Sequence, residues 1–344
     1  MKALLYRQPG GPEVLEYVDV PDPEPGERDV VIDVAATALN HLDVVQRNGW
    51  YALPGFTLPH IAGMDVVGTV SAVGTGVSRV KVGDRVVVDP SMAEVPDGSK
   101  LAGRGDLYGD LGVIGGNIDG DYASQCLAPE THVHLIPDSM DWHQAACFPT
   151  AFLTAWHALF PVGRLVAGET VMIHAAGSGV SMAGIQLAKH AGAVVLATAG
   201  SDEKCERALE LGADHVLNNR TGDVTGWVRT VTNGVGVDMV FDHVGPALWA
   251  QSMFSLRTRG RLVNCGNTTG DTATIPSLGF MFHMGIQILG SDPYSYEEFA
   301  EAWAVYTSSG MRSVIDSVFA LADAAEAQAK MMSTNFFGKI LLEP

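Results

Sequence analysis

The segment from Val171 to Lys189 constrains the fold more than any other part of the chain. It reads as an apolar strand, a turn of small residues (Ala-Ala-Gly-Ser-Gly) and a segment whose apolar residues recur at helical spacing. The same rhythm repeats to about residue 290. Because parallel strands are joined by crossover helices, this alternation predicts an α/β fold with a doubly wound, six-stranded parallel sheet. The strands are expected at 170–174, 194–198, 215–217, 238–242, 261–265 and 287–290, with helices at 182–190, 202–211, 224–232 and 246–256.

The segments on either side of this alternation have a different pattern. Up to about residue 140 the chain shows short β segments separated by glycine and proline, as at Pro25-Gly26. After Asp292 the pattern is helical again and ends in one last strand. We therefore expect the first part to form a second, mainly β domain, with strands at 30–34, 66–73, 85–88 and 132–136. In the C-terminal part, helices are expected at 296–308 and 322–332 and a strand at 339–342.

Composition indicates a folded and acidic chain. The 344 residues are 47% apolar, and 21 basic against 39 acidic residues give a net charge of −18. Because nucleic acids and anionic membranes are bound by clustered positive charge, we expect neither as a partner. The N-terminus lacks the apolar stretch of a signal peptide and the cysteines lack paired spacing, so we expect a cytoplasmic protein. The four cysteines are Cys126, Cys147, Cys205 and Cys265.

The turn after the first strand of the alternation has the composition of a phosphate-binding turn. A pyrophosphate needs backbone N–H groups at short range and the positive end of a helix, and large side chains would obstruct it. The expected contacts are Gly177, Ser178, Gly179 and Val180. Such a turn can also serve tight strand–helix packing, but its place within the repeating pattern favours a dinucleotide site.

The end of the next strand bears on which dinucleotide is bound. NAD sites carry a carboxylate for the ribose hydroxyls about 20 residues after the turn, and Ala199 stands there instead. Ser201 and Lys204 could hold a 2′-phosphate through a hydroxyl and an ammonium group. Ser201 could equally cap the following helix, and Asp202 and Glu203 oppose a bound anion. The pattern favours NADP (NADPH) over NAD.

Further short motifs occur in a fixed order at 38–43, 59–65, 82–86, 210–214, 241–245, 260–266 and 338–340. With the turn, they resemble the medium-chain dehydrogenase/reductase superfamily, which joins a GroES-like domain to a Rossmann domain. The resemblance implies a GroES-like catalytic domain of residues 1–150 and 291–344 and a Rossmann NAD(P)-binding domain of residues 151–290. It also implies a homodimer, in which the apolar stretch 286–289 could pair with its copy.

The resemblance makes the zinc ligands of the family the deciding feature of the chemistry. At the three catalytic ligand positions this chain has Asn40, Met64 and Thr150. An amide, a thioether and a hydroxyl are poor ligands for Zn²⁺. We therefore expect no metal and a likeness to the zinc-free quinone oxidoreductase and enone reductase branch. The cysteine positions of the family's structural zinc loop are also replaced, by Glu94, Asp97, Lys100 and Tyr108.

That branch implies hydride transfer from NADPH to an activated C=C bond of an enone or to a quinone. Without a Lewis acid, exchange between alcohol and ketone is difficult, whereas addition to a conjugated system can proceed with hydrogen bonds to oxygen. Two alternatives stay open. One is a metal-free alcohol dehydrogenase or carbonyl reductase, and the other is a non-catalytic NADPH-binding protein like the crystallin relatives. The substrate would be a small molecule.

Three residues are candidates for catalysis by analogy with the quinone reductase-like members. Asn40 could hydrogen-bond a substrate carbonyl and partly replace zinc, or cap a turn. Tyr51 could donate a proton after hydride transfer, or serve only as an aromatic lid. His41 could relay protons or hydrogen-bond the cofactor's ribose.

Other residues match positions that contact the cofactor in the family. Thr154 corresponds to a hydroxyl close to the nicotinamide, or bonds only its own helix. Asn219 stands where NADPH-dependent members often have tyrosine, which weakens that contact. The remaining candidates follow later strands or match cofactor positions near the C-terminus: His243, Gly266, Asn267, Thr268, Leu289, Gly290, Phe337 and Lys339.

Overall fold

The computed structural model describes residues 1–92, 112–291 and 294–344, and the chain divides into two compact units. Unit 1 comprises Met1–Thr150 and Ser295–Pro344, and unit 2 comprises Ala151–Tyr294. The four positions compared above with the structural zinc loop, Glu94, Asp97, Lys100 and Tyr108, lie outside the described residues. Among the described helices, none has the length and apolar character that a membrane span requires.

Unit 2 contains the predicted six-stranded sheet, and all of its neighbouring strands are parallel. The strand order is β13-β12-β11-β14-β15-β16, so the chain starts in the middle, builds one half and then returns to build the other. The carboxyl ends of β11 and β14 therefore form the switch point where such sheets bind ligands. The strands are β11 (Thr170–Ile173), β12 (Val194–Ala199), β13 (His215–Asn218), β14 (Val237–Asp242), β15 (Leu256–Asn264) and β16 (Gln287–Gly290).

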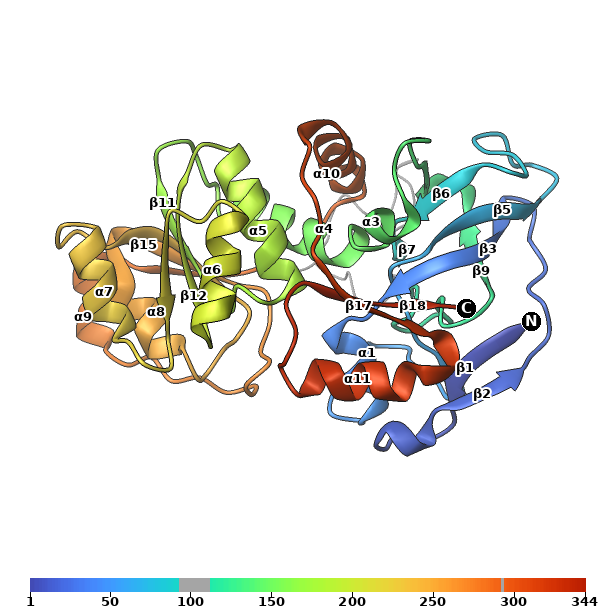
Figure 1. The fold of residues 1–344 in the computed structure, drawn as a ribbon, viewed down its shortest axis with the longest axis horizontal. Coiled ribbons are helices and arrows are strands. Elements are labelled where there is room, and N and C mark those ends of the chain that lie inside the picture. The colour runs from blue at the N-terminus through green and yellow to red at the C-terminus, as the bar shows by residue number, and fades with distance from the viewer. Residues whose placement is uncertain (93–111, 292–293) are drawn as a thin grey trace. The chain divides into compact units, whose positions relative to one another are not determined.

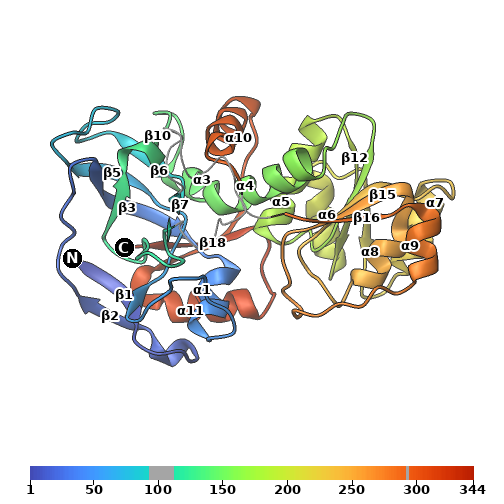
Figure 2. The same ribbon diagram turned by 180° about the vertical axis from the view of Figure 1, so that it is seen from behind.

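Helices lie on both sides of this sheet (Figures 1 and 2). The helix predicted at 182–190 begins earlier, at Gly179, because the small residues of the turn already belong to its first turn. The helix predicted at 246–256 is shorter, since a turn closed by the N–H of Leu248 and the carbonyl of Gly245 precedes it. The helices are α5 (Gly179–His190), α6 (Asp202–Glu210), α7 (Val224–Val231), α8 (Trp249–Ser255) and α9 (Leu278–Met284).

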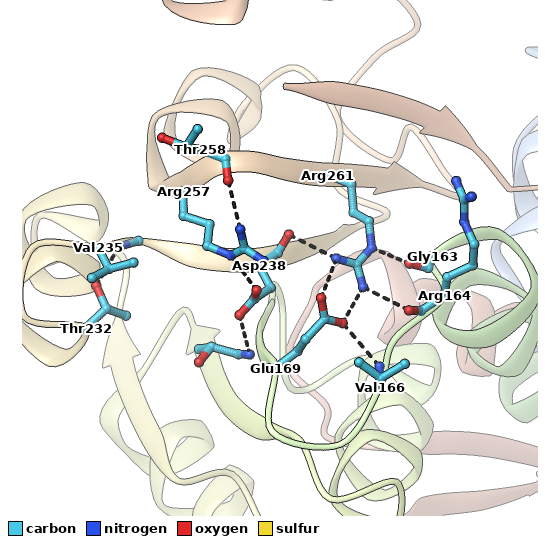
Figure 3. Close-up of polar contacts among 12 residues, drawn as sticks. Gly163, Arg164, Val166, Glu169, Thr232, Val235, Asp238, Arg257, Thr258 and Arg261 are labelled. Atoms are coloured by element: carbon cyan, nitrogen blue, oxygen red, sulfur yellow. Dashed lines mark hydrogen bonds and ion pairs between the residues drawn. The ribbon is translucent and has the colours of Figure 1, made fainter. Parts of the chain in front are cut away.

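A partly buried ion pair joins β15 to the segment that precedes β11 in unit 2 (Figure 3). The guanidinium of Arg261, on β15, pairs with Glu169 through two N–H···O contacts of 3.0 and 2.6 Å. It also donates to the backbone carbonyls of Gly163 and Arg164. The segment that leads into β11 is thereby fixed against β15.

A second ion pair lies next to Arg261. Arg257 pairs with Asp238, and both residues line a cavity of about 430 Å³.

Unit 1 is mainly β, as the sequence predicts. Its larger sheet has seven strands in the order β10-β6-β5-β3-β18-β17, with β9 paired to β3. The predicted strand at 132–136 is shortened because Glu130–His132 form a 3-10 turn. The sequence did not indicate the first strands, β1 and β2, or β17. The strands are β1 (Lys2–Tyr6), β2 (Glu16–Asp19), β3 (Asp29–Ala38), β4 (His60–Ile61), β5 (Val67–Val73), β6 (Arg85–Val88), β7 (Ser91–Met92), β8 (Gly112–Val113), β9 (Gln125–Pro129), β10 (Val133–Leu135), β17 (Ile315–Ala320) and β18 (Lys339–Glu343).

The C-terminal segment completes the core of unit 1. Helix α11 lies beside α1 in both views (Figures 1 and 2), and Val44 of α1 and Met331 of α11 share one buried apolar cluster with Leu4. Strand β18 pairs with the end of β3, which brings the two ends of the unit's sequence together. The helices are α1 (His41–Arg47), α3 (Trp142–Ala146), α4 (Pro149–His157), which continues into unit 2, α10 (Tyr296–Ser309) and α11 (Ala324–Met332).

Candidate active site

The turn between β11 and α5 in unit 2 has the geometry of an anion site. Helix α5 begins at Gly179, and Ser178 at its N-cap makes no side-chain hydrogen bond to the helix. The N–H groups of a first helical turn have no partners within the helix and carry partial positive charge. Ala175, at the start of the turn, has a φ of 51°, which bends the chain sharply. The turn at Gly177 to Val180 can therefore hold a pyrophosphate.

A buried hydrogen-bond network fixes the loops around this turn. His174, at the end of β11, joins the Thr198 hydroxyl at 2.8 Å and the Ser252 hydroxyl at 3.0 Å. Ser252 donates to Asp242 at 2.8 Å, and the other oxygen of Asp242 accepts two backbone N–H groups of the following loop. Burial lowers the pKa of His174, so its ring is neutral. The ends of β11, β12 and β14 are thus held in one arrangement.

His243 belongs to the same region. The Ser181 hydroxyl donates to the carbonyl of His174 at 2.6 Å and lies 2.7 Å from His243 Nε2. Since the single hydroxyl proton goes to the carbonyl, His243 Nε2 must carry a proton and donate it to Ser181. Burial lowers the pKa of His243 to about 4. The Gly266 backbone lies close to the His243 backbone: a Cβ atom on Gly266 would stand 3.1 Å from the His243 carbonyl oxygen.

At the end of β12, Ser201 and Lys204 lie together as expected. The Ser201 hydroxyl accepts the Lys204 backbone N–H at 3.3 Å, so Ser201 does cap α6 while its own proton stays available to another group. A cation that the sequence reasoning missed lies beside them. A side-chain carbon on Gly200 would stand 3.2 Å from Arg220 Nε. Arg220, from the loop after β13, therefore packs its exposed guanidinium over the Gly200 backbone.

The other expected cofactor residues are distributed over both units. Asn219 follows β13, and its backbone N–H donates to the carbonyl of Ala199, so the residue lies beside the end of β12. Thr154 is half-buried on α4. Phe337 is buried in unit 1, and its N–H donates to Asp316 at 3.0 Å. The rest are in the loop after β15 or at the end of β16 in unit 2: Asn267, Thr268, Leu289 and Gly290.

In unit 1, four polar residues from distant parts of the sequence meet in one buried group. Lys339 Nζ lies 3.0 Å from Asp65 Oδ2, 2.8 Å from Asn40 Oδ1 and 2.9 Å from the carbonyl of Leu39. Its three protons therefore have oxygen partners, and none is left for the cofactor contact expected of Lys339. The other carboxylate oxygen of Asp65 accepts the backbone N–H of Thr150 at 2.8 Å.

The Asn40 side chain is engaged on both sides of its amide. The oxygen accepts from Lys339, and Nδ2 lies 3.0 Å from Asp65 Oδ2, 3.2 Å from the carbonyl of Ala38 and 3.3 Å from Thr150 Oγ1. Asn40 also forms a capping box with Asp43 at the start of α1, in agreement with the capping interpretation. Direct bonding of a substrate carbonyl, the expected catalytic role, would require the amide to give up one of these partners.

Two further carboxyl groups lie buried behind this group. Desolvation raises the pKa of Asp43 to about 6. The backbone N–H of Asn40 and the Tyr122 hydroxyl both donate to this carboxyl group, and these hydrogen bonds lower the pKa by less than desolvation raises it. Desolvation also raises the pKa of Asp121 well above its usual range. The remaining catalytic candidates differ in position: His41 is exposed at the start of α1, and the Tyr51 side chain is 52% exposed.

Comparison with known proteins identifies the family. Residues 26–138 match the family described as alcohol dehydrogenase GroES-like domain, and residues 179–308 match the one described as zinc-binding dehydrogenase. A quinone oxidoreductase of Pseudomonas aeruginosa is 34% identical over 100% of this chain and 99% of its own length. The chain belongs to the medium-chain dehydrogenase/reductase superfamily. Unit 1 is accordingly the GroES-like part and unit 2 the Rossmann part, as the resemblance implied.

Solved structures of this superfamily extend the likeness to cofactor-bound members. The quinone oxidoreductase of Escherichia coli complexed with NADPH is 28% identical, with a TM-score of 0.83 and 100% coverage of both chains. A structure described as an NAD-dependent alcohol dehydrogenase is 37% identical, with a TM-score of 0.94 and 100% coverage of both chains. The protein is an NAD(P)H-dependent oxidoreductase, which confirms the predicted enzyme class.

The zinc that the superfamily implies does not fit the residues at the family's catalytic ligand positions. Asn40 directs its amide oxygen to the Lys339 ammonium group, and Met64 and Thr150 offer a thioether and a hydroxyl. None of these is the thiolate, imidazole or carboxylate that binds Zn²⁺, and the carboxylate beside them, Asp65, is paired with the Lys339 ammonium group. Within the described ranges, no cluster of three or more His, Cys, Asp or Glu could hold a metal ion.

Proposed function

We propose that this oxidoreductase works without zinc, prefers NADPH, and transfers hydride to an activated C=C bond of an enone or to a quinone. The observation that carries the proposal is the buried group of Asn40, Asp65, Thr150 and Lys339. In place of a Lewis-acid site it offers hydrogen-bonding groups and an ammonium group paired with a carboxylate. Hydrogen bonds to oxygen suffice for addition to a conjugated system, whereas oxidation of an alcohol needs help with its proton.

The preference for NADPH rests on the charge at the end of β12. Ala199 leaves no carboxylate to repel a 2′-phosphate, and Ser201, Lys204 and Arg220 offer a hydroxyl and two cations. Phosphate groups bind best to such charge-assisted donors. A relative with a bound NADPH supports the same cofactor. The alternative, NAD with an alcohol substrate, is favoured by the likeness to the NAD-dependent alcohol dehydrogenase.

The roles of the residues follow from their chemistry. NADPH supplies the hydride, which adds to the β-carbon of an enone while the electron pair of the C=C bond moves toward the carbonyl oxygen. The turn at Gly177–Val180 would hold the pyrophosphate. A proton must then reach the α-carbon, and the exposed Tyr51 and His41 are the candidate donors, directly or through water. The net change is one hydride and one proton added across the double bond.

We also propose that the protein is a homodimer in the cytoplasm. Strand β16 is an edge of the sheet in unit 2, since among the described strands it pairs with β15 alone, and Ile288 on it is 37% exposed. Leu278 and Phe282 of the preceding helix, α9, are each 66% exposed. An apolar sheet edge of this kind is suited to pairing with a second copy.

The proposed location in the cytoplasm rests on the cysteines. All four cysteines are free, which fits a reducing compartment.

The test is the consumption of NADPH and NADH with 2-cyclohexen-1-one, 1,4-benzoquinone and cyclohexanone, together with the zinc content of the same sample. Turnover of the enone or the quinone with NADPH, a saturated ketone as the enone product, and well under one zinc per chain are expected. An allylic alcohol from the enone, or stoichiometric zinc that activity requires, would contradict the proposal. Tight NADPH binding without any turnover would favour a non-catalytic binding protein.

A further inference from the structure

Three polar side chains, those of Lys339, Asn40 and Thr150, are hydrogen-bonded in series, and two of them stand at the family's zinc-ligand positions. Lys339 Nζ donates to Asn40 Oδ1 at 2.8 Å, and Asn40 Nδ2 lies 3.3 Å from Thr150 Oγ1. These contacts also settle the orientation of the amide, because an ammonium group can face only its oxygen. Asn40 Nδ2 has two protons for three acceptors, so Thr150 Oγ1 shares them with Asp65 Oδ2 and the carbonyl of Ala38. The proton of the Thr150 hydroxyl itself has no acceptor among the residues that the structure describes.

We propose that Thr150 is a catalytic residue whose hydroxyl donates to the carbonyl oxygen of the substrate, and that Lys339 strengthens this donor through Asn40. The inference deepens the proposed function and rests on it. It assigns to Thr150 a role in substrate binding and to Asn40 and Lys339 positioning roles. From the sequence alone, Asn40 is itself a candidate for the carbonyl contact or a turn cap.

Polarisation passes from Lys339 through Asn40 to Thr150. An ammonium group at the amide oxygen withdraws electron density, so the N–H groups of Asn40 become better donors. A hydroxyl that accepts from a polarised N–H becomes in turn a better donor through its own proton. Asp65 holds the arrangement in place by accepting from Lys339, from Asn40 and from the Thr150 backbone N–H.

The position of Thr150 suits this role. The residue is half-buried, in the first turn of α4, and its backbone is fixed by the 2.8 Å bond from its N–H to Asp65 Oδ1. A hydroxyl on a fixed backbone is oriented before the substrate arrives, which is what makes an oxyanion donor effective. As hydride adds to the β-carbon, the carbonyl oxygen gains negative charge, and the Thr150 proton stays on Thr150 while its hydrogen bond shortens. The proton added to the α-carbon comes from elsewhere.

The first experiment compares Thr150→Val, which removes the hydroxyl at nearly constant shape, with Thr150→Ser, which keeps it. Thr150→Val should lower kcat for 2-cyclohexen-1-one by about 100-fold, the scale of one lost oxyanion donor, and leave the NADPH Kd unchanged. Thr150→Ser should stay within about fivefold of the parent. Thr69→Val, on β5, is the matched control for the substitution itself. Equal kcat values for the parent and Thr150→Val would overturn the inference.

A second measurement reads the hydrogen bond without turnover. The infrared C=O band of bound, isotope-labelled cyclohexanone should lie at lower frequency in the parent than in Thr150→Val, and Thr150→Ser should restore it. Lys339→Met should move the band part of the way back, and Lys339→Arg should move it less. A band that Thr150→Val leaves in place overturns the inference even if the enone is a good substrate. A band that responds, with no turnover of any enone or quinone, supports the inference and contradicts the proposed function.

Cobalt serves as a third measurement, because Co²⁺ in a tetrahedral site gives a strong visible absorption. The parent protein should show no such band when Co²⁺ is added, since the three ligand positions hold Asn40, Met64 and Thr150 and the Asn40 amide oxygen is bound to the Lys339 ammonium group. A stoichiometric band that Asn40→Ala abolishes would overturn the inference, because the site would then be a metal site.

Discussion

The ammonium group of Lys339 lies 3.0 Å from a carboxylate oxygen of Asp65, and both side chains are buried in unit 1. The two residues come from opposite ends of the chain: Asp65 precedes β5, and Lys339 opens β18. The pair therefore links the last strand of the unit to the segment that also carries Met64. The pair thus stabilises the unit as well as belonging to a candidate catalytic group.

Breaking this pair should destabilise the protein. Lys339→Met leaves the Asp65 carboxylate buried without its cation, and removal of one partner of a buried pair costs about 3–5 kcal/mol. The free energy of unfolding from urea denaturation measures the loss. The double variant Lys339→Met with Asp65→Asn should be more stable than Lys339→Met alone, because no uncompensated charge remains. Lys81→Met, at an exposed lysine, is the control and should change stability by less than about 0.5 kcal/mol.

The sequence predicted the parts of the fold that local pattern determines. The central strands of unit 2, β11, β12 and β14, are almost wholly buried and alternate with helices, so their apolar runs were visible, and the turn at Gly177 marked the start of α5. Strand β17 was missed because polar and exposed positions interrupt its apolar pattern, and β1 was missed because its buried apolar run, residues 3–6, is only four residues long. Local pattern says little about such strands, which depend on their neighbours in the sheet.

The candidate site was predictable only where its residues are close in sequence. Asn40 and Lys339 are 299 positions apart, so nothing local indicated that they are in contact. The contact changes the interpretation of both residues. The Asn40 amide has hydrogen-bond partners within the protein for its oxygen and its nitrogen, and all three protons of the Lys339 ammonium group have oxygen partners. Arg220 was missed for the same reason, since it reaches Gly200 only because β13 is parallel to β12.

Arg220 should contribute to the choice of cofactor. If its guanidinium binds the 2′-phosphate, Arg220→Ala should weaken NADPH binding about tenfold or more and leave NADH binding within twofold, because NADH lacks that phosphate. Direct titration of the protein with 2′,5′-ADP and 5′-AMP measures the effect without turnover. Lys204→Ala should act in the same direction, and Arg229→Ala, on α7, is a matched control. An equal loss of affinity for both nucleotides would show that Arg220 does not bind the 2′-phosphate.

Asp43 should make stability depend on pH in a defined window. Burial raises its pKa to about 6, above the value of about 3.9 in an unfolded chain, so folding favours the protonated form. The unfolded state then releases the proton first as the pH rises, and stability falls between about pH 4 and 6 and is constant above. Asp43→Asn lacks this dependence. The difference in unfolding free energy between Asp43→Asn and the parent should change by about 3 kcal/mol across that window. Asp138→Asn, at an exposed site, should show no such change.

The exposed edge of the sheet in unit 2 gives the last prediction. If β16 pairs with its copy across a twofold axis, the backbone of β16 lies at the interface and the side chain of Ile288 lies close to it. Ile288→Lys should then shift the protein toward a monomer, because charged side chains on an edge strand oppose pairing with a second edge. Sedimentation velocity over a range of concentrations measures the shift. Leu209→Lys, at a 45% exposed position on α6, should leave the assembly unchanged. A parent protein that sediments as a monomer, or an Ile288→Lys dimer of undiminished affinity, would exclude this edge as the interface.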